Sequence, residues 1–476
     1  MTPRGHEAAA LALHRFGFGP RGDTIARIAA DPRAALLAEL QGPHAGQLAI
    51  DLPSSGQAAR AVFEFQAERR AKQKLAVRVQ KVGESGDDAQ AMAAFERTLP
   101  ARNPAHPHPA PPLPQQLLLN EAHARFDAAT AVEIGFVERL VWFWSNHFCV
   151  SADKIVAMAG PYEREAIRPH VLGRFVDMLQ AVETHPAMLF YLDNVESMGP
   201  DSTLGIDRDK GLNENLARET LELHTLGARS GYSQADVTNF AKVLTGWTWL
   251  PPAEPIHGGE FVFNPLLHEP GDQTVLGKSY RDTGLGQGRA VLADLARHPA
   301  TAQHIARQLA SHFVADEPPP TLVGKLASTF IATDGDLAEL AKTLVNADES
   351  WTAARTKLKP PAEWLVAILR LGGAPSALPI GRLMGAQAML GEALWRPPAP
   401  NGYSDRQAAW IDGLPHRLDI ATELAPHLAA NTDPRQLLEA ALGPLASTQT
   451  RDTILRAESR TQALALLVMA PEFLRS

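Results

Sequence analysis

The sequence has one cysteine, Cys149, and no run of about 20 apolar residues. A lone cysteine excludes an internal disulfide, so packing must stabilise the fold. The missing apolar run excludes a membrane-spanning helix. There is no excess of basic residues either, since the formal charge is −8, and we expect no nucleic-acid partner. Only a short apolar stretch, Ala8 to Leu13, follows the N-terminus. We therefore expect a cytoplasmic chain as written, or a periplasmic or exported one if a leader was removed.

Several sequence signatures are also missing. We find no dinucleotide-binding glycine pattern, phosphate-binding loop, H-E-x-x-H or G-x-S-x-G, no internal repeat and no strand–helix alternation. The periodicity predicts a mainly α fold: a large multi-helix globular domain with a loop-rich insertion near 250–288. That insertion contains residues typical of a small β-hairpin, and we expect it to lie over the helical core.

The chain divides into three regions that we expect to form one structural unit. Residues 1–115 predict an N-terminal helical arm, with a charged helical hairpin over 57–95 and a proline-rich linker over 99–114. We expect residues 116–350 to form the central helical core with the insertion. We expect residues 351–476 to form C-terminal helices that pack on that core.

The stretch from Asn213 to Gly227 carries the most chemical information. On a helix of about 100° per residue, its leucines form one stripe, which is typical of a core face. The other side is polar, with Asn215, Arg218, Glu219 and Glu222. One interpretation is a solvated face with pairs such as Glu214–Arg218. The other is a polar cluster facing a cleft, in which Glu219, Glu222 and His224 bind a ligand or carry protons.

A second segment, 138–148, is aromatic on nearly every side and predicts a central buried helix. Asn146 and His147 within it need partners, so they belong either to a packed network or to a site. His170 follows a helix-start signal, where exposed N–H groups favour anions. Arg15, between aromatic residues, either clamps an anion or caps carbonyl groups. Cys149 is expected to be a buried, inert thiol.

Five motifs combine along the chain: His14–Gly19, Trp142–Phe148, His185–Asn194, Asn213–Gly227 and Leu244–Trp247. Together they resemble the bacterial domain-of-unknown-function 1800 family, over nearly the whole chain. The resemblance implies an all-helical fold, an exported location for many members and a sulfatase-like partner protein. It assigns no reaction, but it points to Arg15, Asn146, His147, His170, Glu219, Glu222 and His224.

We expect an enzyme, most plausibly a hydrolase, whose site lies between the helices that contain 142–148 and 213–227. Its catalytic residues would be Glu219, Glu222, His147, His224 and His170. Its substrate-binding residues would be Arg15, Arg218, Asn146 and Asn215. A divalent metal of unassigned identity would be its cofactor if the glutamates hold one. On a regular helix Glu222 and His224 point about 160° apart and cannot chelate one ion together.

The alternative is a non-catalytic binding or assembly protein whose polar networks only fix the packing. Such a protein would act with a partner through the charged 57–95 hairpin or the aromatic loop that begins at Trp395.

Overall fold

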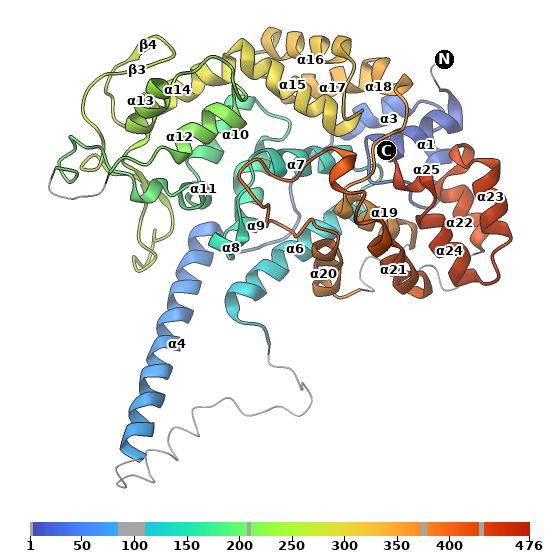
Figure 1. Cartoon of the computed structure of the whole chain (residues 1–476), viewed down its shortest axis with the longest axis horizontal. Coiled ribbons are helices and arrows are strands. Elements are labelled where there is room, and N and C mark those ends of the chain that lie inside the picture. The colour runs from blue at the N-terminus through green and yellow to red at the C-terminus, as the bar shows by residue number, and fades with distance from the viewer. Residues whose placement is uncertain (1–2, 84–109, 207–210, 373–377, 428–432) are drawn as a thin grey trace.

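The computed structural model describes residues 3–83, 110–206, 211–372, 378–427 and 433–476. It is 61% helical with 4% strand, which confirms the mainly α fold. Figure 1 shows an elongated helical body from which one long helix, α4, projects. Within the described ranges, no helix combines the length and apolarity needed to cross a bilayer.

The first helix is a central part of the body. After α1 (Gly5–Arg15), the chain forms α2 (Thr24–Ile28) and α3 (Pro32–Glu39). Alanines and leucines of α1 are almost fully buried in the main core. The turn after α1 requires glycine, because a Cβ on Gly17 would lie 2.3 Å from the backbone oxygen of Ile134. The N-terminal segment is therefore fixed against the rest of the fold.

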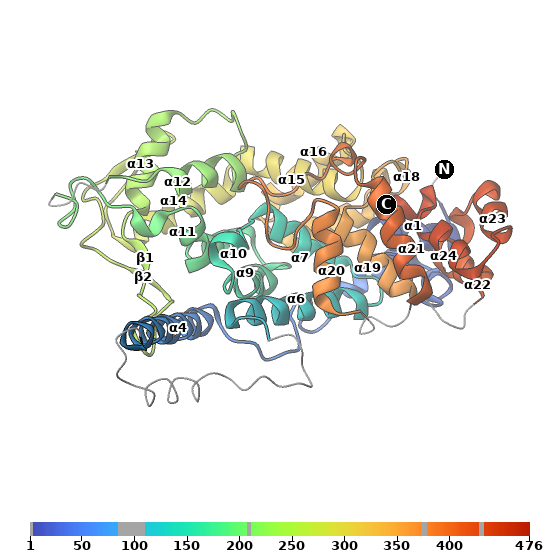
Figure 2. The same ribbon diagram turned by 60° about the horizontal axis from the view of Figure 1, so that its bottom comes forward.

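Of the region 1–115, α4 (Ser55–Gly83) is the element that projects. Figure 2 shows it beside the loop that joins β1 and β2. The second half of the expected hairpin, and the proline-rich linker up to residue 109, lie outside the described residues.

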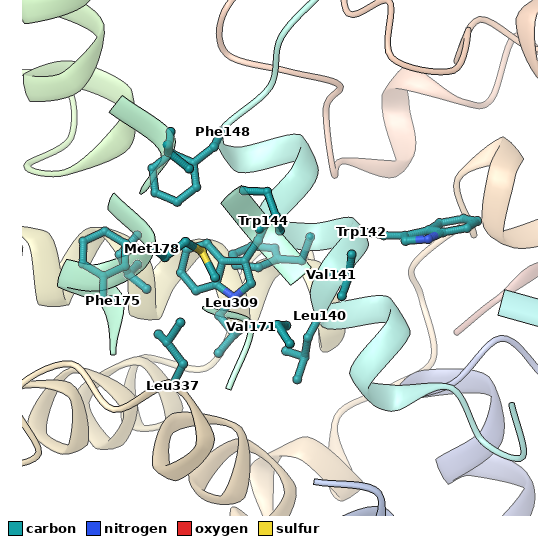
Figure 3. Close-up of a cluster of buried hydrophobic side chains, with 14 of the residues drawn as sticks. Leu140, Val141, Trp142, Trp144, Phe148, Val171, Phe175, Met178, Leu309 and Leu337 are labelled. Atoms are coloured by element: carbon teal, nitrogen blue, oxygen red, sulfur yellow. The ribbon is translucent and has the colours of Figure 1, made fainter. Parts of the chain in front are cut away.

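The main core surrounds α7 (Phe136–His147), as the aromatic pattern predicts. Figure 3 shows Trp144 and Phe148 packed among Phe175, Met178 and Leu309. Around α7 lie α6 (Leu113–Ala131), α8 (Ala152–Ile155), α9 (Ala159–Tyr162), η1 (Glu163–Ile167), η2 (Arg168–His170), α10 (Phe175–Glu183), α11 (Pro186–Tyr191) and η3 (Asn194–Glu196).

The helix expected over 213–227 is shorter and changes its geometry. It begins as α12 (Asn215–Glu219) and continues as the π-helical turn η4 (Thr220–His224). A π turn accommodates one more residue than an α turn, so the side chains after Glu219 rotate away from their α-helical directions. As a result Leu221 is fully buried, whereas Leu223 is only partly buried. Gly227 follows η4 in a left-handed conformation, with φ of +88°.

The small β-hairpin expected in the insertion is present as β3–β4, and a second antiparallel strand pair precedes it. After α13 (Gln234–Leu244), β1 (Trp247–Trp249) pairs with β2 (Phe261–Phe263), and β3 (Gln273–Val275) pairs with β4 (Lys278–Tyr280). Both pairs lie at one end of the body; β3 packs on α13, and β4 on α14 (Leu285–Arg297) (Figure 1).

The remaining helices complete the body. These are α15 (Pro299–Phe313), α16 (Pro320–Ala332), α17 (Leu337–Asn346), α18 (Glu349–Thr352), α19 (Pro361–Gly372), α20 (Ile380–Met389), η6 (Gln407–Ala409), α21 (Leu414–Leu424), η7 (Ala425–His427), α22 (Pro434–Ala441), η8 (Gly443–Leu445), α23 (Thr448–Leu455), α24 (Arg460–Val468) and α25 (Pro471–Leu474). Residues of α19 belong to both the main core and a second, C-terminal core, so this helix joins the two.

Candidate functional site

A cleft of about 740 Å³ opens where the end of α7, the η4 turn, α15 and the loop over 397–410 meet. No residue of the insertion over 250–288 lines the cleft. The loop that borders it is the one over 397–410. Its lining is mixed, and its polar residues include Asn146, His147, Glu222, His304, Arg307, Gln308, Ser311, Asp405 and Arg406.

Two histidines of the cleft bind the carbonyl groups at the end of η4. Nε2 of His147 lies 3.2 Å from the backbone oxygen of His224, and Nε2 of His304 lies 3.0 Å from that of Leu223. Each Nε2 must carry the proton, because a carbonyl only accepts. The imidazole centroids are 5.9 Å apart. Neither Nδ1 atom has a hydrogen-bond partner among the described residues, so both keep an available lone pair.

Burial disfavours the charged form of both imidazoles. Burial lowers the pKa of His147 well below its ordinary value of 6.5, and the neighbouring His304 and His224 lower it further. Burial likewise lowers the pKa of His304. A neutral imidazole with a free nitrogen is the form that accepts a proton or binds a metal.

His224 itself lies behind this pair and is paired with a glutamate. Its Nδ1 lies 2.7 Å from Oε1 of Glu183, and both side chains are 1% exposed. The carboxylate fixes the tautomer with the proton on Nδ1. Nε2 has no hydrogen-bond partner among the described residues. The ring of Phe148 packs against the imidazole with centroids 5.2 Å apart.

Glu219 is half-buried next to this pair and makes no hydrogen bond within the described part of the chain. Desolvation raises the pKa of its carboxyl; His224 opposes this shift and Glu222 adds to it. The charge of Glu219 in turn helps to raise the pKa of Cys149, which burial chiefly raises to about 12. Glu219 is thus a carboxyl that retains its proton to higher pH, within electrostatic range of an imidazole.

Glu222 lines the cleft and accepts a hydrogen bond from the Tyr232 hydroxyl at 3.1 Å. Arg218 is instead used in a surface network, where it lies 2.9 Å from Glu214 and 3.0 Å from Oε1 of Gln234. Asn215 is exposed and does not line the cleft. The polar side of the 213–227 segment therefore divides: its first turn faces solvent, and its second faces the histidines.

Asn146 positions the loop that borders the cleft. Its Nδ2 donates to the backbone oxygen of Tyr403 at 2.9 Å, and its Oδ1 accepts from the backbone nitrogen of Tyr403 at 2.8 Å. The side chain therefore pairs with the loop as a strand would. Gly402 fits here with φ of +72°, because a Cβ would lie 2.5 Å from the backbone oxygen of Asn146.

Neither Glu219 nor His224 is among the residues that line the cleft, and two further predicted site residues lie elsewhere. Arg15 is fully buried and donates to the backbone oxygens of Ser350 at 2.8 Å and Ala353 at 3.0 Å, so it caps carbonyl groups. His170 lies on the short helix η2 and does not line the cleft. Burial lowers its pKa, but no other predicted site residue contacts it.

Sequence reasoning missed Glu183 and His304. Glu183 ends an ordinary amphipathic helix, 41 positions before its histidine, and nothing in its local pattern marks it. His304 lies on α15 outside the five motifs, so the sequence did not mark it. The structure places it against Gly227, where a Cβ would lie 2.9 Å from Nδ1 of His304.

The donor set does not form a metal centre of the usual kind. Among the residues that the structure describes, no three His, Cys, Asp or Glu side chains are grouped so that they could hold one ion. His147 and His304 each make one hydrogen bond, through Nε2, to a backbone carbonyl, and Glu222 accepts a hydrogen bond from Tyr232.

Fold and cleft together define a mainly helical protein with a cleft that contains His147, His304 and Glu222. Residues 11–475 match a family described as "Protein of unknown function (DUF1800)". The chain belongs to this family, as its motifs indicated. Comparisons with curated proteins and with solved structures find no match.

Proposed function

We propose that the chain is an enzyme of hydrolytic type that transfers protons through His224 and Glu219. The observation that carries this proposal is the Glu183–His224 pair: the carboxylate holds Nδ1 at 2.7 Å, and Nε2 is left without a partner. An imidazole oriented in this way is the usual form of a general base.

The two groups have complementary tasks. Nε2 of His224 accepts a proton from the attacking water or hydroxyl, and Glu183 stabilises the imidazolium that forms. Glu219, whose raised pKa favours the protonated carboxyl, donates a proton to the leaving group. A carboxyl whose pKa is raised by desolvation is suited to act as a general acid.

The cleft residues bind and orient the substrate in this proposal. His147 and His304 offer Nδ1 lone pairs as acceptors, and Arg307 offers a guanidinium that makes no ion pair within the described residues. Because no three-ligand metal group is found among those residues, the proposal uses side-chain proton transfer alone.

The proposal is tested with a panel of chromogenic carboxylic, phosphate and sulfate esters and glycosides. Glu219→Gln and His224→Asn should each lower any turnover at least about 100-fold, the usual contribution of one general acid or base. His170→Asn is the control, and its turnover should equal that of the wild type. Nitrogen NMR of the imidazoles gives a readout that needs no substrate: His224 should carry its proton on Nδ1. Full turnover in His224→Asn, or a proton on Nε2, would refute the assignment.

The binding or assembly alternative has its own supporting observation. His147 and His304 each satisfy a carbonyl group at the end of η4, which a purely structural role also explains. In that case the chain would act with a partner, such as the sulfatase-like protein that the family resemblance implies. Two results together would favour this alternative. No panel substrate would be turned over, and Glu219→Gln and His224→Asn would lower the stability of the protein to the same extent.

A further inference from the structure

The exposed part of α4 is the strongest charged feature outside the cleft. From Gln66 to Arg78 the helix has solvent on nearly every side, with only Ala76 partly covered. At 1.5 Å per residue, the 13 positions form a rod about 20 Å long. An isolated helix of this length is marginal in water, so a surface that covers it would stabilise it.

The charge of α4 is opposite to that of the remaining chain. The chain carries −8, and α4 alone carries seven Lys and Arg against two Glu, or +5, which leaves −13 for all other residues. A negatively charged surface would therefore attract α4 and repel the rest of the molecule, which fixes the orientation of approach.

The cations on α4 are not evenly distributed. Arg70, Lys74 and Arg78 follow one another at intervals of four, so they form one row with about 6 Å between neighbours along the axis. None of the three has an ion-pair partner among the described residues. Glu68 lies off this row and pairs with Lys72 at 3.6 Å. The row is therefore a continuous, unneutralised basic face.

Apolar side chains accompany this face. Phe63 is 41% exposed and Val77 is 54% exposed, and helical spacing places both on the side of the basic row. The base of the helix is anchored, since Ser55 donates its hydroxyl to Glu165 at 2.7 Å and Arg60 donates to the backbone oxygen of Gly258 at 2.7 Å. The basic face is thus presented in a fixed direction.

We propose that the Arg70–Lys74–Arg78 face of α4 docks on the surface of a membrane that contains anionic phospholipids. The cations contact the headgroups, and Phe63 and Val77 enter the interfacial layer, as in helices that lie on a bilayer without crossing it. A planar surface matches a straight row on a projecting rod, and the acidic body stays on the aqueous side. This role does not depend on the proposed catalysis.

The test compares two charge-matched variants of the full-length chain. Arg70→Glu/Lys74→Glu reverses two cations of the row, and Arg69→Glu/Lys72→Glu reverses two on the other side of the same helix. Sedimentation with vesicles of phosphatidylcholine, with or without phosphatidylglycerol, measures binding. Each cation near an anionic leaflet contributes about a fivefold change in partitioning. The first variant should therefore lose at least about 25-fold in binding, whereas the second should stay within a few-fold of the wild type.

Several results would overturn the proposal. These are wild-type binding that does not depend on phosphatidylglycerol, an equal loss in both variants, or equally tight binding to double-stranded DNA at the same salt concentration. Self-association that disappears in Arg70→Glu/Lys74→Glu, without vesicle binding, would make a second copy of the chain the occupant of this face. Circular dichroism and thermal unfolding should match between the variants, because these side chains are exposed.

Discussion

Replacing Arg168 with methionine should destabilise the protein severely. Arg168 is 1% exposed and makes four hydrogen bonds. Two join it to Glu138 at 2.6 and 2.8 Å, one to Glu163 at 2.9 Å and one to the backbone oxygen of Gly46 at 2.9 Å. Without the guanidinium, two buried carboxylates share one remaining cation, Arg125, which lies 2.8 Å from Glu163.

The magnitude follows from this geometry. Removing one partner of a buried ion pair costs about 3–5 kcal/mol, because the other charge stays buried without compensation. That is a large part of the roughly 5–15 kcal/mol that stabilises a folded protein. Arg174→Met is the matched control: Arg174 pairs with Asp334 on the surface, with side chains 45% and 44% exposed. Exposed pairs contribute about 0–1 kcal/mol.

Urea unfolding followed by circular dichroism measures both variants. The deficit of Arg168→Met should shrink as the pH falls from 7 toward 4. In the wild type the partners of Glu163 hold its pKa below the ordinary 4.5 against the cost of burial. Its stabilising effect is therefore present above that value and is lost as the pH falls through the lowered pKa. In the variant Glu163 lacks the charge of Arg168 that helps to lower its pKa, so its carboxyl becomes protonated at higher pH, which relieves the uncompensated charge.

A double variant sharpens the test. Glu138→Met/Arg168→Met removes both members of the bidentate pair and leaves Glu163 with Arg125. It should be more stable than Arg168→Met alone, since replacing a whole buried pair costs less than breaking it. If Arg168→Met lies within about 1 kcal/mol of Arg174→Met, or if the double variant is the less stable, the reasoning about this network is wrong.

Three further predictions concern the surroundings of the cleft. Gly402→Ala should lower stability by about 1–3 kcal/mol, because φ is +72° and its Cβ would lie 2.7 Å from Oδ1 of Asn146; urea unfolding measures this, and a neutral result would show that the loop yields freely. Glu392→Gln should remove a pH dependence of the stability. Burial raises the pKa of Glu392 from 4.5 to about 7, so the folded state binds a proton that the unfolded state has lost between these values. Wild-type stability therefore falls by at most about 3 kcal/mol as the pH rises from 4.5 to about 7. Unfolding at pH 5 and pH 8 should differ less in the variant than in the wild type, and an equal difference would contradict the cause. Cys149, 5% exposed with a pKa raised to about 12, should resist a thiol reagent such as 5,5′-dithiobis(2-nitrobenzoate) in the native state and react fully in urea; rapid native labelling would contradict the burial argument.

The fold was predictable where one physical signal dominates. The aromatic run in 138–148 permits no exposed face, and α7 is indeed buried on all sides except near Asn146 and His147. Glycines gave reliable ends for elements, as Gly17 after α1 and Gly227 after η4 show. Each of these inferences needs only local sterics or hydrophobic burial.

The site was predictable only in part, because its geometry depends on a departure from regular helix. Periodicity at 100° per residue placed Glu219, Glu222 and Arg218 on one side. The π turn then separates them, so that Glu222 reaches the cleft while Arg218 stays at the surface. Single-sequence patterns do not mark such a turn. Nor do they mark Glu183, whose role comes from tertiary packing.

His14 and His185 differ from His147, His224 and His304 in how many ring nitrogens make hydrogen bonds. His14 lies 2.9 Å from the backbone oxygen of Ala441 through Nε2, while its Nδ1 faces Lys359 at 3.0 Å. His185 likewise uses both nitrogens, facing Glu165 at 3.0 Å and accepting from the backbone nitrogen of Ala187 at 3.1 Å. His147, His224 and His304 each use one nitrogen and leave the other without a partner among the described residues. A histidine that only satisfies packing gains by using both nitrogens. In the proposed function, a bound substrate would complete the three half-used imidazoles gathered around this turn.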